Sequence, residues 1–179
     1  MINLFKKITL IGLFAISTIA MANNYASHVH GHAEMTIAVE NNNVDLKLIA
    51  PAESLLGFEH KAITPEEISK VIAMKEHLIN HANVILFNGG QCHIKNVNVN
   101  TNDILRYDQQ DHAQEYMYSH AEITLKYQYN CLKANDISSA KIQLFKHFSA
   151  LEKVEVIWLT YAKQSSIKLD ANTTEINFQ

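Results

Sequence analysis

The sequence predicts an α+β domain, a largely antiparallel sheet of about seven strands with two helices packed on one face. Short runs in which apolar and polar residues alternate recur along the chain, as is typical of half-buried strands. Asn- and Gly-containing turns separate several of these runs by hairpin-length links. Two longer segments instead space their apolar residues as helices do.

The chain begins with an expected signal peptide at residues 1–22. Two lysines precede an apolar run of 13 residues, 8–20, which is too short to span a bilayer comfortably. Small residues at the end of this run predict cleavage after Ala22, leaving one soluble, exported domain over residues 23–179. An uncleaved membrane anchor is the alternative.

Composition bounds the function further. Of 179 residues, 47% are hydrophobic and 18% charged, which indicates one globular domain. The formal net charge of −3 argues against nucleic-acid binding, which normally needs a basic excess. Ten histidines stand against the single arginine Arg106. No nucleophile elbow, phosphate loop, dinucleotide fingerprint or zinc-protease motif is present, so we expect no enzyme.

The first half of the chain predicts a hairpin followed by a helix. Apolar alternation over 32–39 and 44–50 flanks the turn 41–43, and a short helical turn follows until Gly57 stops it. Thr64 begins the next helix with a capping box and Pro65 at its first position. We expect this helix to reach residue 80. Two strands follow it, at 84–87 and at 92–99 with a bulge near residue 96.

The second half begins with a polar stretch, 101–119, which we interpret as an extended loop. The clearest strand pattern of the chain follows over 121–131. A second helix is expected at 136–148. The last expected elements are strands at 154–160, 166–169 and 174–178.

Cys92 and Cys131 are the only cysteines, and both lie in expected strands. In an exported protein an isolated pair usually forms a disulfide, which here would tie two strands together. Metal ligation by the thiolates is the alternative.

The histidines indicate metal chemistry. His28, His30 and His32 alternate, so in an extended chain they project from one face, and Gly31 relaxes the backbone between them. Imidazole nitrogens suit zinc, copper or nickel. A solvated polar tail is the alternative.

Other histidines divide between ligand and structural interpretations. His112 and His120 lie in or beside the polar loop, where carboxylates are near in sequence and a metal could be wrapped, but an ordinary solvated loop fits equally well. His77 and His81 share a helix face and lack the Glu that a zinc protease needs. Their position near a helix C-terminus favours a structural role. The remaining pair, His93 and His147, has no partner near in sequence.

Residues 28–34, His-Val-His-Gly-His-Ala-Glu, resemble the N-terminal motif of the ZrgA-like family of zinc-regulated periplasmic proteins. The resemblance extends over the chain beyond the expected signal peptide. Further matching segments are 51–56, Gly57-Phe58-Glu59-His60, Cys92, Cys131, His120-Ala121-Glu122 and Trp158-Leu159-Thr160. Many members carry a long His- and Asp-rich insertion before the position of His120, whereas residues 108–119 here contain only His112.

The resemblance implies a periplasmic protein that captures or buffers zinc and supports its uptake through a membrane transporter. By position it marks His28, His30, His60 and His120. We therefore expect Zn²⁺ to be bound by His28, His30 and His120. The fourth ligand would be His32, His60, His112 or a carboxylate. A copper- or nickel-binding protein, or a periplasmic interaction module with a His-rich interface, are the alternatives.

Overall fold

The computed structural model describes residues 29–105 and 121–178. The expected signal peptide and most of the expected polar loop lie outside them. A six-stranded sheet runs in the order β4-β5-β2-β1-β7-β8, and a three-stranded sheet runs in the order β3-β6-β9. The large sheet consists of β1 (His32–Glu40), β2 (Asn43–Pro51), β4 (Cys92–Asn100), β5 (Glu122–Cys131), β7 (Lys153–Leu159) and β8 (Gln164–Leu169). The small sheet consists of β3 (Ile85–Asn88), β6 (Ser139–Ile142) and β9 (Glu175–Asn177).

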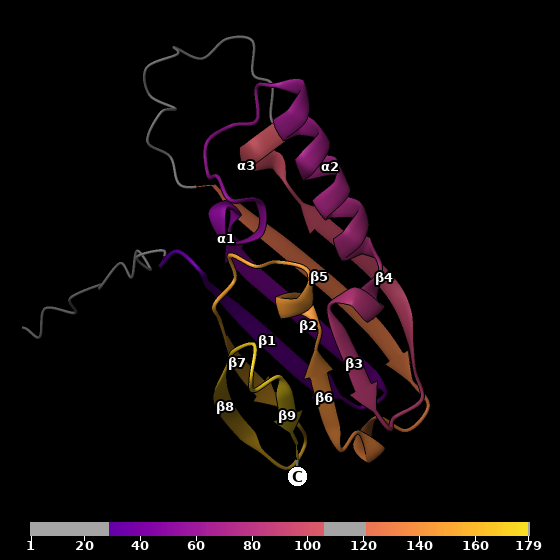
Figure 1. Ribbon diagram of the computed structural model, residues 1–179. Helices are drawn as coiled ribbons and strands as arrows, with labels where there is room; N and C mark the ends of the chain where they lie inside the picture. Colours follow the sequence, from indigo (N-terminus) through magenta and orange to yellow (C-terminus); the bar gives the residue numbers. More distant parts are fainter. Residues whose placement is uncertain (1–28, 106–120, 179) are drawn as a thin grey trace, which may run out of the picture.

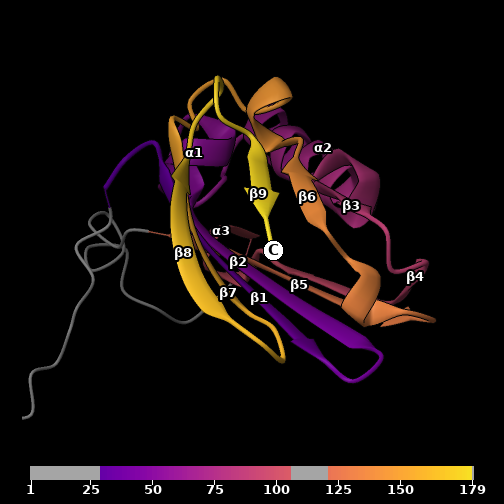
Figure 2. The same ribbon diagram turned by 90° about the horizontal axis from the view of Figure 1, so that it is seen from below.

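The small sheet and the helices cover one face of the large sheet (Figures 1 and 2). The helices are α1 (Ala52–Leu56), α2 (Pro65–Ile79) and α3 (Asn102–Leu105), with short 3-10 turns η1 (His81–Asn83), η3 (Ala134–Asp136) and η4 (Leu144–Lys146). Among the described residues no helix or strand covers the other face, which we call the open face (Figure 2). The α+β class and the placement of helices on one face are thus confirmed.

The strands follow the alternation of the sequence. In β1 the inward residues Ala33, Met35, Ile37 and Val39 are buried, and in β5 the inward residues are almost completely buried. The predicted hairpin of β1 and β2 is antiparallel and turns at Asn41, whose φ is 53°. The core therefore lies between the large sheet and the layer above it.

The boundaries of the first two helices agree with the sequence signals. The Thr64 hydroxyl accepts a hydrogen bond from the backbone N–H of Glu67, and the Glu67 carboxylate accepts one from the Thr64 N–H, which completes the predicted capping box. Gly57 ends α1 with φ of 80°, a left-handed conformation that glycine adopts without strain. On α2, Val71, Met74 and Leu78 face the core.

One expected element is wrong, and one strand pair departs from the antiparallel order that the sequence predicts for most of the sheet. The helix expected at 136–148 is replaced by η3, β6 and η4, because Ala140 and Ile142 alternate as buried residues of a strand that pairs with β3 and β9. The large sheet is mixed, because β1 pairs in parallel with β7. The six other strand pairs among the described residues are antiparallel. The described residues contain nine strands rather than about seven.

The predicted disulfide joins Cys92 of β4 to Cys131 of β5, which are direct partners in the sheet register. The predicted bulge appears as a register shift between Ile94 and Asn96. Within 29–105 and 121–178, no helix combines the length and the apolar character needed to cross a membrane.

Candidate metal centre

The turn before β1 determines where the N-terminal histidines lie. Gly31 adopts φ of +75°, and β1 begins only at His32. The Gly31 N–H donates to Ser54 Oγ (3.0 Å), and its carbonyl oxygen accepts from the N–H groups of Glu152 (2.7 Å) and Lys153 (2.9 Å). His30 and His32 therefore do not lie in one extended strand, as the alternation had suggested.

His30 meets a carboxylate from the loop between α1 and α2. Its Nε2 lies 3.2 Å from Oε2 of Glu59, and the two side chains are 55% and 32% exposed. Gly57 brings Glu59 there because its left-handed conformation turns the chain at the end of α1, where its N–H donates to the Glu53 carbonyl oxygen. An imidazole nitrogen and a carboxylate oxygen thus face each other at the solvent boundary.

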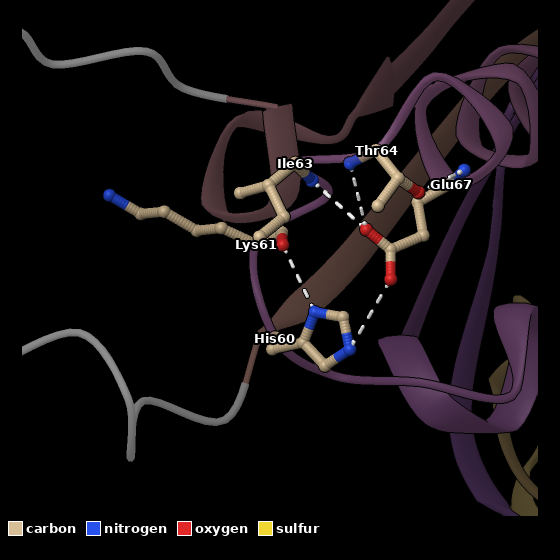
Figure 3. A network of polar contacts seen from close by, with 5 residues as sticks. All are labelled: His60, Lys61, Ile63, Thr64 and Glu67. Carbon is tan, nitrogen blue, oxygen red and sulfur yellow. Dashed lines mark hydrogen bonds and ion pairs between the residues drawn. The ribbon is translucent and has the colours of Figure 1, made fainter.

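His60 lies in a separate polar network (Figure 3). Its Nδ1 donates to the carbonyl oxygen of Lys61 (3.0 Å), and its Nε2 lies 3.6 Å from Oε1 of Glu67. The other oxygen of Glu67 accepts the N–H groups of Ile63 (3.0 Å) and Thr64 (3.1 Å). These backbone hydrogen bonds, from Thr64 first and then Ile63, hold the pKa of Glu67 below its ordinary value.

His32 points to the open face. It lines a hollow there together with Glu34 of the same strand, Glu155 of the neighbouring strand β7 and Glu122 of β5. We call this the open-face hollow. Lys168 also lines it and partly offsets the negative charge of the glutamates, since its Nζ lies 3.7 Å from Glu155 Oε2. His30, in contrast, contacts the loop above the covered face.

His28, His112 and His120 lie outside the described residues. The described residues next to two of them lie near one another, because Val29 lines the open-face hollow together with Pro51 and Glu122. In addition, the Ala52 N–H donates to the carbonyl oxygen of Ala121 (2.8 Å). The start of the described chain and the start of β5 therefore meet at the same end of β2.

The remaining histidines lie elsewhere. The rings of His77 and His147 are 4.1 Å apart, and that of His81 lies edge-on to Tyr129 at 5.5 Å. Burial and then the charge of His147 lower the pKa of His77. His93 is exposed on the edge strand β4. Within the described part of the chain, no three His, Cys, Asp or Glu side chains are grouped so that they could hold a metal ion.

The pair of His30 and Glu59 nevertheless has donors that suit zinc. Zinc binds imidazole nitrogen at about 2.0–2.1 Å and carboxylate oxygen at about 2.0–2.2 Å, so two such donors on one tetrahedral ion lie about 3.4 Å apart. The observed separation of 3.2 Å is close to this value.

A family model described as ZrgA family zinc uptake protein matches residues 27–178. The chain belongs to the ZrgA family. The resemblance inferred from the N-terminal histidine motif is thus confirmed, and ZrgA membership ties the chain to zinc uptake. No curated protein matches the chain in sequence.

For this ZrgA member, reasoning from the sequence missed three residues that shape the site. Glu59 stands in the Gly-Phe-Glu-His segment, but the resemblance marked only the histidine of that segment. Glu67 was expected to cap α2, and its contact with His60 was not foreseen. Ser54 carries no sequence signal, because its hydrogen bond to Gly31 joins residues 23 positions apart.

Proposed function

We propose that this protein is exported to the periplasm, binds zinc reversibly there and supports its uptake through a membrane transporter. Zinc is the cargo of the protein. The observation that carries the proposal is the match of the zinc uptake family over residues 27–178. The proposed role is non-enzymatic.

Export is supported by the expected signal peptide and by the cysteines. Disulfides persist in oxidising compartments such as the bacterial periplasm and are rare in the cytosol. The bond between Cys92 and Cys131 fits such a compartment.

The proposed zinc ligands are His28, His30 and His120. The fourth position is open to His32, His60, His112 or a carboxylate. Val29 and Glu122 both line the open-face hollow, and each is close in sequence to one proposed ligand, His28 or His120, which supports placing these two together. His30 enters the set through its contact with the carboxylate of Glu59.

Reversible binding follows from the proposed ligand type. Imidazole binds zinc in its neutral form, so protons compete with the metal as the pH falls through the region of about 6.5 where free histidine titrates. We expect the protein to hold zinc near neutral pH and to release it more readily in acid.

The test is calorimetric titration of zinc into the purified mature protein. The double variant His30→Ala/His120→Ala should lose tight binding while circular dichroism shows an unchanged fold. The matched control His93→Ala, on the exposed face of β4, should bind as the wild type does. Unchanged zinc affinity in the double variant would refute the proposed ligand set.

The identity of the metal needs a separate observation, because Cu²⁺ outcompetes Zn²⁺ at most sites of this kind. Elemental analysis of protein purified from the periplasm without a metal-affinity column should find zinc. Copper or nickel in its place would favour the alternative metals. A metal-free protein whose melting temperature does not respond to zinc would favour an interaction module with a His-rich interface.

A further inference from the structure

We propose that Glu59, and not its neighbour His60, is the residue of segment 57–60 that binds zinc together with His30. The inference rests on the proposed zinc binding and specifies the carboxylate of that site. Zinc binds both carboxylate oxygens and imidazole nitrogens, but the structure places these two neighbours in different surroundings.

The first argument is the distance between the donor atoms. His30 Nε2 and Glu59 Oε2 are 3.2 Å apart, and two donors on one tetrahedral zinc ion are about 3.4 Å apart. The ion can therefore replace the hydrogen bond with a shift of a few tenths of an ångström. A neutral His30 then carries its proton on Nδ1, and a cationic one releases a proton to solvent.

The second argument is that the backbone on both sides of this pair is fixed. His30 precedes Gly31, whose N–H donates to the Ser54 hydroxyl and whose carbonyl oxygen accepts from the N–H groups of Glu152 and Lys153. Glu59 follows Gly57, the left-handed end of α1. A site whose ligands stand on such turns needs little rearrangement to bind, which favours affinity.

His60 makes contacts of its own, with Lys61 and Glu67 (Figure 3). Its ring stacks on Phe58 with centroids 5.1 Å apart, and its Nδ1 donates to the Lys61 carbonyl oxygen. Its Nε2 faces Glu67, at a separation of 3.6 Å that would by itself also suit a metal.

Charge decides against the pair of His60 and Glu67. Glu67 stands in the first turn of α2, where the helix dipole is positive and a cation is disfavoured. Its Oε2 already accepts two backbone N–H groups of that terminus. Glu59 lies outside any helix, in the loop between α1 and α2, where no helix dipole opposes a cation. We therefore assign His60 to the support of the loop and Glu59 to zinc.

The experiment compares zinc affinity and stoichiometry by calorimetry in the mature wild type and in three single variants. Glu59→Gln should lower the zinc affinity about tenfold or more, as changes at metal-site carboxylates do. His60→Asn should leave it at the wild-type value. Glu66→Gln, which removes an equally negative side chain from an exposed position in the same region, controls for net charge.

A double variant tests whether the two donors act on one ion. If they do, His30→Ala/Glu59→Gln should bind zinc no more weakly than His30→Ala alone, because partners at one site are not additive. Melting temperatures without zinc should be the same for Glu59→Gln and the wild type, since the contact between His30 and Glu59 lies at the solvent boundary and adds little stability.

The possible failures are distinguishable. A wild type that binds no zinc overturns both the proposed function and this inference. A wild type that binds zinc, with Glu59→Gln unchanged or with His60→Asn showing the larger loss, overturns the inference alone.

Discussion

Gly31 joins three parts of the chain at one residue. Its φ of +75° is in the left-handed region, and an added Cβ would lie 3.0 Å from Cγ of Glu152 and 3.2 Å from the Ala150 carbonyl oxygen. Gly57, with φ of +80°, has open space where its Cβ would be. The two glycines therefore need their conformation equally, but only Gly31 also needs the absence of a side chain.

Replacing Gly31 by Ala should therefore cost more stability than replacing Gly57. The left-handed conformation alone costs a non-glycine residue on the order of 1 kcal/mol, and Gly31→Ala adds the steric conflict with the segment before β7. Urea denaturation of both variants gives the comparison. Equal losses would show that the turn relaxes without resistance.

The pair of His77 and His147 makes stability depend on pH. Because burial and the neighbouring His147 lower the pKa of His77, the unfolded chain takes up a proton at a pH where the folded chain does not. Stability is therefore complete above the ordinary pKa of about 6.5 and falls as the pH drops from there toward the lowered value.

Melting curves between pH 7.5 and 5 should show a shallower decline for His77→Asn than for the wild type. The exposed His93→Asn is the matched control and should decline as the wild type does. Parallel declines in all three proteins would mean that His77 does not cause the acid sensitivity.

At the scale of elements, α2 carries its own start signal. The capping box of Thr64 and Glu67 satisfies backbone N–H groups that the first helical turn leaves without partners. The same Glu67 meets His60, so the helix start and the loop before it share one carboxylate. Local sequence thus determines both the first residue of α2 and the conformation of the loop before it.

Thr64→Ala should lower the free energy of unfolding by about 1 kcal/mol, because the Glu67 N–H loses its acceptor. Ser69→Ala, exposed within the same helix, should cause no loss, since alanine favours helices. Denaturant titrations of the two variants measure the difference. A neutral Thr64→Ala would mean that water replaces the cap.

Segment 136–148 marks where local pattern stops being sufficient. Its apolar residues fit a helix nearly as well as a strand, and the choice depends on β3 and β9, which are distant in sequence. In contrast, the alternation of β1 and β5 and the cap of α2 are local signals, and they predicted those elements well. Where the spacing of apolar residues is clear, the local sequence determines the type of secondary structure. Where it is ambiguous, pairing with distant strands determines it.

At the scale of the whole molecule, the disulfide ties β4, an edge strand of the large sheet, to β5. The two cysteines are 39 positions apart. In the chain-entropy view such a bond stabilises by restricting the unfolded chain, by roughly 4 kcal/mol for a loop of this length.

The double variant Cys92→Ala/Cys131→Ala should therefore unfold at a lower denaturant concentration, with a loss of up to roughly 4 kcal/mol. The reduced wild type should behave similarly. If reduction leaves the midpoint unchanged, the bond contributes nothing to stability.

The candidate site was only partly predictable. The spacing of the histidines predicts a metal site with His30 and His32 on one face, but Gly31 turns the chain between these two residues. Glu59 belongs to the matching Gly-Phe-Glu-His segment, but its proposed role as a ligand depends on its contact with His30, 29 positions away. Such contacts form only in the folded protein, and the local spacing of residues in the sequence does not predict them.

The position of β1 has a consequence for the order of folding. The strand forms a hairpin with β2, but its other neighbour, β7, enters the chain more than a hundred residues later. Gly31 accepts hydrogen bonds from Glu152 and Lys153 at the very start of that late strand. In the proposed export the amino end would cross the membrane first, yet the turn that holds His30 closes only once β7 is present. Such non-local pairing is slow, so the candidate metal centre would be completed late, and the proposed zinc binding would require a finished fold.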